Sequence, residues 1–286
     1  MTLKQSTASR RAVIQLLGAT FIWGATFVVL RDTVAHVDPV ALVLARFALA
    51  APLLFVIALL TRRPFTRAAW LGGSLSGVVA ALAFALQAKG LTVTPAGTSA
   101  FLTSLGSLFA GVFAWPLLGQ RPRVALVAGM LVAGAGTWLL TGMHSLSLGA
   151  GEVVTIIGAL AFGLQVVVLA KFSPRADPLA LVAVQALALA VAVAPFGALR
   201  LDQARVSREL LPGLAYLVIG GSLVAPLLQV LAQRALSAGR TGLLLGFEPV
   251  FAALFALTLG AEHPPTAWWG GAVLILMAVW FVESRA

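Results

Sequence analysis

Long apolar runs separated by short polar joints are the feature that most constrains this chain. A helix needs about 20 mostly apolar residues to cross a bilayer, and ten such segments can be cut from the sequence. Only 10% of the residues are charged and 60% are hydrophobic, so the chain cannot cover a water-soluble surface. The segments also lack the alternation of barrel strands. We therefore predict an all-α integral membrane protein with ten transmembrane helices. They centre roughly on residues 12–30, 39–60, 69–89, 96–118, 124–142, 150–170, 178–199, 210–232, 241–260 and 266–283.

The basic residues indicate how these segments face the membrane. With a cytoplasmic N-terminus, thirteen Lys and Arg residues fall in inner joints, five fall in outer joints, and Arg46 lies inside a segment. Cytoplasmic loops of membrane proteins are enriched in Lys and Arg. We therefore predict a multi-pass protein of the inner (plasma) membrane with both termini in the cytoplasm. The lipid bilayer is then the partner that accounts for the net charge of +10, because Lys and Arg are concentrated in the cytoplasmic loops. We therefore expect no nucleic-acid partner.

One stretch of the sequence recurs in the second half. "DPVALVLARFALA", which starts at Asp38, returns as "DPLALVAVQALAL", which starts at Asp177, and Arg46 falls opposite Gln185. Neighbouring stretches match at similar offsets. Paired Asp-Pro, Gln and Trp residues are too rare in so apolar a chain to be chance matches. The sequence therefore indicates an internal duplication.

The duplication has a physical consequence for topology. Each copy, residues 1–145 and 146–286, holds five predicted spans. An odd number of spans makes the second copy enter the membrane from the opposite side. We predict two inverted five-helix repeats in one integrated transmembrane domain. Inverted repeats are typical of secondary transporters, with the substrate site near the midplane between the halves.

Four stretches carry a resemblance to a known family. They are "FIWGATF" from Phe21, "ARF" around Arg46, "GSLFAGVFAWPLLGQRP" from Gly106 and "FEPVFAALFALTLGAEHP" from Phe247. With them the chain resembles the drug/metabolite transporter superfamily, in particular its EamA-type ten-helix exporters. Gln120 stands where such proteins usually have an acidic residue. The resemblance implies export of amino acids, including aromatic ones, of other metabolites, or of cationic drugs.

Two charged residues lie inside predicted spans, where exposure to lipid is costly. Arg46 lies roughly 10 Å from the start of its helix, at 1.5 Å per residue. It either extends to the outer interface or faces a cavity, where it binds a carboxylate or organises a gate. Glu248 can carry a proton, accept hydrogen bonds from backbone amides, or contact a substrate ammonium group.

Amide, hydroxyl and aromatic side chains complete the candidates. The symmetric pair Gln87 and Gln229 can bind both poles of a zwitterion, or can join helices by hydrogen bonds. Aromatic residues, Trp23 first among them, can line an apolar cavity. The predicted substrate-binding residues are Trp23, Arg46, Phe84, Gln87, Ser99, Phe101, Thr103, Phe162, Gln165, Gln229 and Glu248.

Catalytic patterns are missing from the sequence. There is no cysteine, no phosphate-binding loop, and no cluster of histidines with metal-ligand spacing, so we expect no enzyme, no metal and no cofactor. We expect a secondary transporter that exports small amphipathic metabolites, with amino acids as the best candidates, by alternating access. The alternatives are a multidrug exporter of cationic compounds and a membrane-embedded lipid enzyme. Proton coupling stays open, as does the choice between monomer and homodimer.

Overall fold

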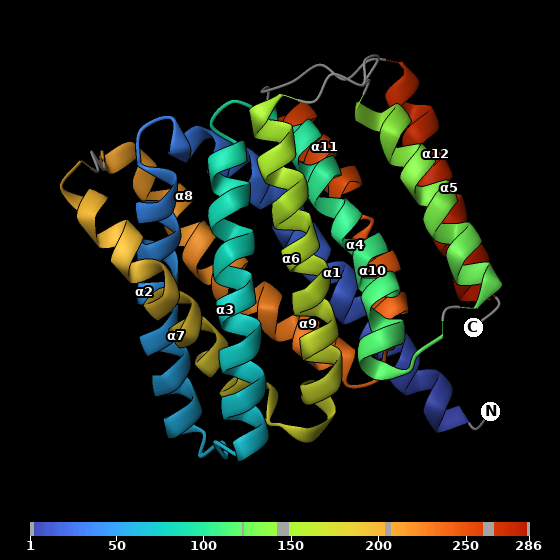
Figure 1. The fold of residues 1–286 in the computed structure, drawn as a ribbon, viewed down its shortest axis with the longest axis horizontal. Coiled ribbons are helices and arrows are strands. Elements are labelled where there is room, and N and C mark those ends of the chain that lie inside the picture. The colour runs from blue at the N-terminus through green and yellow to red at the C-terminus, as the bar shows by residue number, and fades with distance from the viewer. Residues whose placement is uncertain (1–2, 122, 142–148, 204–206, 260–265, 285–286) are drawn as a thin grey trace.

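The computed structural model describes residues 3–121, 123–141, 149–203, 207–259 and 266–284. All regular structure within these residues is helical, and the helices lie side by side (Figure 1). The helices of the first half are α1 (Leu3–Val34), α2 (Pro39–Leu60), α3 (Arg67–Gly90), α4 (Ala96–Leu118) and α5 (Val124–Thr141). Those of the second half are α6 (Ala150–Phe172), η1 (Ser173–Arg175), α7 (Pro178–Gly197), η2 (Ala198–Gln203), η3 (Arg208–Leu210), α8 (Leu211–Tyr216), η4 (Leu217–Val224), α9 (Ala225–Gln233), α10 (Ala238–Leu245), α11 (Glu248–Thr258) and α12 (Ala267–Ser284).

The lengths of these helices match a membrane protein. In the part of the chain that the structure describes, eight helical segments are long and apolar enough to cross a bilayer. Two shorter apolar helices, Val124–Gly136 and Trp269–Ala278, fall in the fifth and tenth predicted segments. Large apolar side chains such as Leu60 and Trp280 are exposed on the outside, as lipid contact requires. The all-helical, multi-pass pattern is therefore confirmed, while the count of ten spans stays a prediction.

The eighth and ninth predicted segments are not single α-helices. The eighth passes from α8 into the π-helix η4 and then into α9. The ninth is interrupted between α10 and α11, at Gly246 and Phe247. Pro249 follows this break in the first turn of α11, and a proline ring has no N–H for the preceding turn. The proline therefore explains the second interruption.

Glycines allow two close helix crossings between the halves. A methyl group at Gly24 on α1 would lie 2.5 Å from Cβ of Phe251 on α11. A methyl group at Gly163 on α6 would lie 2.7 Å from Cβ of Phe109 on α4. Gly24 corresponds to Gly163 in the internal sequence match, and Phe109 corresponds to Phe251. The two crossings therefore join corresponding residues of the two copies, and small residues permit both.

Helices α2 and α7 are joined at both ends by equivalent interactions. Asp38 and Asp177 cap the two helices, and Oδ1 of each accepts hydrogen bonds from two backbone N–H groups at 2.9–3.2 Å. Arg200, just after α7, donates to Oδ2 of Asp38 at 3.0 Å. Arg63, just after α2, lies 3.5 Å from Oδ2 of Asp177. Because each arginine follows one helix and contacts the start of the other, α2 and α7 run antiparallel.

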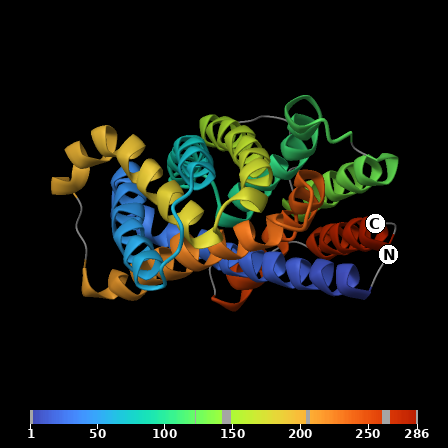
Figure 2. The same ribbon diagram turned by 90° about the horizontal axis from the view of Figure 1, so that it is seen from below.

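The remaining helices surround the middle of the molecule. Helices α5 and α12 pack against each other at one end, far from the pair α2 and α7 (Figure 1). Seen from below, α1 and α9 lie on one side, and α3 and α6 lie on the other (Figure 2). This arrangement leaves residues of both halves facing one central region.

The two roles of Asp38 lead to a first prediction. Asp38→Ala removes the cap, which costs about 1 kcal/mol, and also the ion pair with half-exposed Arg200, which contributes at most about 1 kcal/mol. Asp38→Asn keeps the cap and loses only the ion pair. We expect the thermal midpoint of the detergent-purified protein to fall more for Asp38→Ala than for Asp38→Asn. Arg200→Gln is the matched control and should equal Asp38→Asn; equal losses in both Asp38 variants would contradict the capping role.

Candidate functional site

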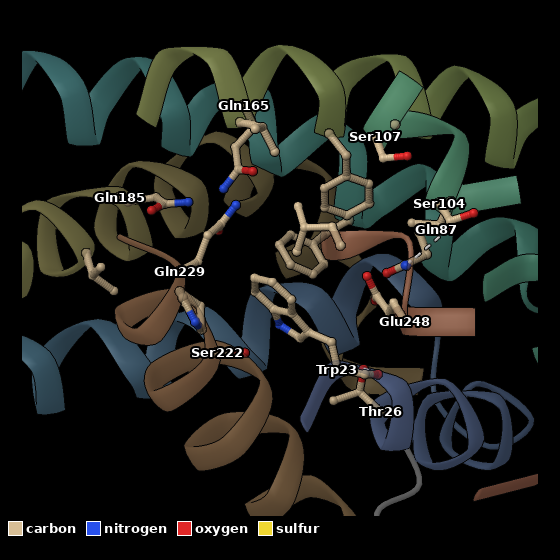
Figure 3. A pocket seen from close by; sticks show the side chains of 18 of the residues that line it. Trp23, Thr26, Gln87, Ser104, Ser107, Gln165, Gln185, Ser222, Gln229 and Glu248 are labelled. Carbon is tan, nitrogen blue, oxygen red and sulfur yellow. Dashed lines mark hydrogen bonds between the residues drawn. The ribbon is translucent and has the colours of Figure 1, made fainter. Parts of the chain in front are cut away.

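A central cavity lies between the two halves. Its empty volume, including the open mouth, is about 790 Å³. Helices α1 to α4 contribute to the wall from the first half, and α6, α7, η4, α9, α10 and α11 from the second (Figure 3). The wall consists of Trp23, Thr26, Phe47, Phe84, Gln87, Thr103, Ser104, Gly106, Ser107, Phe162, Gln165, Val166, Val182, Gln185, Ala186, Ser222, Pro226, Gln229, Leu245 and Glu248.

Most of the predicted site residues lie in this wall. Eight of the eleven do so, namely Trp23, Phe84, Gln87, Thr103, Phe162, Gln165, Gln229 and Glu248. Ser99 and Phe101 are buried on α4, in the turn before Thr103, and are not part of the wall. Arg46 lies directly behind the wall. Contact of these residues with a substrate stays a prediction.

Three amide side chains gather at one side of the cavity. Gln165, Gln185 and Gln229 come from α6, α7 and α9 and lie close together in Figure 3. The Oε1 atoms of Gln185 and Gln229 are buried and accept no hydrogen bond from any described residue. A buried oxygen without a donor costs about 1–3 kcal/mol. A ligand with N–H or O–H groups would remove this cost.

The carboxylate of Glu248 lies at the other side, near Gln87 (Figure 3). Gln87 donates to Oγ1 of Thr103 at 3.4 Å. Glu248 is in the first turn of α11, where the helix dipole stabilises a negative charge. Among the described residues its carboxylate has no hydrogen bond or ion pair. Its carboxylate is therefore available to a cationic group or a proton.

Aromatic rings form the apolar part of the wall. The ring of Phe84 lies between Phe47 and Phe162, with centroids 5.1 Å and 5.0 Å away. The ring of Trp23 lies between the amide side and Glu248 (Figure 3), and its Nε1 donates to the carbonyl of Gly221 at 3.0 Å. The cavity thus has an apolar middle and two polar sides, a shape that suits a small amphipathic molecule.

Arg46 does not extend to the surface. Its side chain is 1% exposed, and its Nε donates to Oγ of Ser222 at 3.2 Å. The guanidinium carbon lies 5.5 Å from the ring centroid of Phe47 and 5.4 Å from that of Phe84. These three neighbours all line the cavity. Of the two interpretations of Arg46, the geometry favours the cavity.

Several polar or aromatic wall residues lie outside the predicted set: Thr26, Phe47, Ser104, Ser107, Gln185 and Ser222. Thr26 follows Trp23 by three residues and Ser107 follows Thr103 by four, so the helical period could have found both. Ser222 lies in the π-helix, where each turn holds more residues than in an α-helix. A regular helical pattern therefore could not have placed Ser222.

Comparisons with known proteins match this chain to transporters over most of its length. The model of the EamA-like transporter family matches residues 10–142 and again residues 149–284. The chain is 27% identical to an uncharacterized transporter of Archaeoglobus fulgidus over 92% of this chain and 83% of the relative. It is 26% identical to the uncharacterized transporter YvbV of Bacillus subtilis over 64% and 61% of the two chains. One solved crystal structure has the same fold, with a TM-score of 0.77 and 22% identity over 96% of this chain and 97% of the other.

The unpaired amide of Gln229 leads to a second prediction. Gln229 and Gln233 are both 1% exposed on α9, and both have an unpaired Oε1. Gln233 differs because its Nε2 donates to the carbonyl of Val166 at 2.9 Å. We expect Gln229→Leu to raise the thermal midpoint of the ligand-free protein, because it removes an unsatisfied polar group. Gln233→Leu should raise the thermal midpoint less, because it also removes a hydrogen bond that contributes about 1 kcal/mol.

The opposite order of midpoints would show that the Gln229 amide is held by the protein and is not free for a ligand.

Proposed function

Because the chain belongs to the EamA-like transporter family of the drug/metabolite transporter superfamily, we propose that this membrane transporter exports small amphipathic metabolites. Amino acids with hydrophobic or aromatic side chains are the substrates that suit the cavity best. The wall of the cavity is the observation that supports this choice. It combines aromatic rings with unpaired amide oxygens on one side and an unpaired carboxylate on the other. The ammonium group and the side chain of an amino acid complement these groups.

The mechanism we propose is alternating access between two inverted five-helix repeats, divided near residue 145. The antiparallel pair α2 and α7 supports an inverted relation, because these helices correspond in the sequence repeat. The equivalent crossings at Gly24 and Gly163 support it as well. The two matches to one family model also favour a duplication. Residues 142–148, at the proposed junction, lie outside the described residues.

The setting that we propose follows from the chain's charges and helices. Thirteen basic residues at predicted inner joints support cytoplasmic termini in the inner (plasma) membrane. None of the described residues of α5 and α12 belongs to the cavity wall, and large apolar side chains on their outer faces are exposed, so these faces can pack against lipid or against a second copy. We propose a monomer or a homodimer that uses this face.

A multidrug exporter of cationic compounds is the second candidate. It is favoured by Glu248, whose carboxylate faces the cavity without a cationic partner among the described residues. Such an exporter would accept amines that lack a carboxylate. An amino-acid exporter would reject them. The two candidates therefore differ in a way that one substrate panel can resolve.

Transport by the purified protein in liposomes provides the third prediction. We expect saturable flux of labelled phenylalanine, leucine or a related amino acid, and little flux of 2-phenylethylamine. Gln229→Leu should reduce this flux by about tenfold or more, since the loss of one good hydrogen bond to a charged group costs about 1.5–3 kcal/mol. Asp38→Asn is the control and should keep at least half of the flux. Absence of saturable flux for every amino acid would overturn the proposed substrate class.

The fourth prediction concerns Glu248. If its carboxylate binds the substrate ammonium group, Glu248→Gln should lower phenylalanine flux by about tenfold or more, as expected for a charge-assisted hydrogen bond. Flux of 3-phenylpropionate, which lacks the ammonium group, should change by less than about twofold. Equal losses for both compounds would exclude this role.

The same liposomes test proton coupling. An imposed pH gradient that accelerates flux in the wild type, but not in Glu248→Gln, would assign the proton to this carboxylate. Flux that is the same with and without the pH gradient would exclude proton coupling.

A further inference from the structure

Arg46 is a buried charge without an opposite charge. An arginine side chain stays protonated at every physiological pH, and this one is 1% exposed. The two ion pairs found among the described residues are Arg63 with Asp177 and Arg200 with Asp38, and neither includes Arg46. Glu248, the one acidic side chain that the described residues contribute to the cavity wall, does not pair with it. The charge of Arg46 is therefore not neutralised by a described carboxylate.

The hydrogen bonds of the guanidinium group are also incomplete. Nε donates to Oγ of Ser222, but the buried Nη2 has no acceptor among the described residues. The rings of Phe47 and Phe84 lie against the group, and their π-electrons compensate part of the charge. They cannot accept hydrogen bonds as strong as those to an oxygen. A buried cation in this state is costly, and an anion would remove the cost.

The backbone packs closely beside Nη2 of Arg46. Gly220, Gly221 and Ser222 belong to the π-helix η4, and π-helical turns occur often at functional sites. A methyl group at Gly221 would lie 3.1 Å from Nη2 of Arg46, so any larger side chain there would crowd this nitrogen. Ser222 lines the cavity and also contacts Arg46. Ser222 therefore links the cavity wall to the guanidinium group.

We propose that Arg46, held in place by the Ser222 hydroxyl and lying beside Gly221, forms the binding site for the carboxylate group of the transported molecule. A carboxylate suits a guanidinium group because its two oxygens can accept parallel N–H hydrogen bonds. The proposal rests on the proposed transport function. It narrows the substrates to molecules that carry a carboxylate beside an apolar body, and it excludes simple cationic drugs.

The site exists in one half of the molecule alone. The sequence match places Gln185 opposite Arg46, and the amide oxygen of Gln185, a residue of the cavity wall, is buried without a donor among the described residues. Arg46 thus places a cation behind the cavity wall on the α2 side, and Gln185 places an acceptor oxygen on the α7 side. A zwitterion can satisfy both, whereas an amine or a neutral molecule would leave Nη2 of Arg46 without an acceptor.

Binding to the purified protein in nanodiscs tests the proposal, with 3-phenylpropionate and its amide, 3-phenylpropionamide, as a matched pair. We expect the wild type to bind the carboxylate at least about tenfold tighter than the amide, as for a charge-assisted pair. Arg46→Gln should reduce carboxylate affinity to that of the amide, and Arg46→Lys should lose part of the difference. Arg200→Gln is the control, because its guanidinium pairs with Asp38 at the surface, and it should keep the full preference.

Gly221→Ala leaves Arg46 in place and is the alternative test if the Arg46→Gln variant does not fold. The added methyl group would lie 3.1 Å from Nη2 and 2.9 Å from Cγ2 of Thr26. It should weaken carboxylate binding by about tenfold and amide binding by less, and the amide affinity reports any effect that acts through Thr26. The proposal is overturned if the wild type shows no preference for the carboxylate. It is equally overturned if Arg46→Gln, or Gly221→Ala in its place, keeps that preference. This assay measures binding alone, so its failure is distinct from absent amino-acid flux in liposomes, which would overturn the proposed function.

Discussion

Lipid offers no hydrogen bonds, and this constraint orders the whole structure. Every polar side chain in a span must find a partner, reach an interface or face an internal cavity. Large apolar side chains such as Leu60 and Trp280 occupy the outside, while Gln185, Gln229 and Arg46 point inward. Polar groups are therefore concentrated where the two halves meet, and several of them lack partners there. Three of the buried groups that lack a partner, on Arg46, Gln185 and Gln229, lie in or directly behind the cavity wall, where a substrate would supply the missing groups.

The scaffold is duplicated, but its charges are not. Corresponding residues form the crossings at Gly24 and Gly163. Helices α2 and α7 have equivalent aspartate caps and are joined by reciprocal ion pairs. Arg46, in contrast, has Gln185 as its counterpart, and Glu248 has Gly106. A symmetric cavity could hold a ligand in two equivalent orientations. Here Arg46 lies behind the wall on one side and Glu248 lies in the wall on another. A zwitterionic ligand that paired with both charges would therefore be bound in a single orientation.

The sequence predicted what depends on local patterns. Hydrophobic length located the eight long apolar helical segments, and Asp-Pro pairs located the starts of α2 and α7. The cost of polar groups in lipid selected five residues of the cavity wall, and the expectation of an apolar lining added three aromatic ones. It could not predict features that depend on packing. Ser99 has the same chemistry and helical face as Thr103 but lies one turn beyond the cavity. Ser222 enters the wall through a π-helical turn, which no hydrophobic period indicates. Whether Arg46 points outward or inward is likewise decided by its neighbours, not by its depth in α2.

Both interruptions described in the spans lie beside the unequal charges. The π-helix η4 faces Arg46, and the break before α11 places Glu248 in a first helical turn. Irregular backbone at membrane depth is tolerated only inside protein or along a cavity, and discontinuous helices mark the substrate sites of many transporters. The helix that corresponds to the broken one, α4, is continuous and has Gly106 where Glu248 stands. Charge and backbone irregularity thus occur together in this molecule, as expected if both serve one ligand and not the stability of the fold.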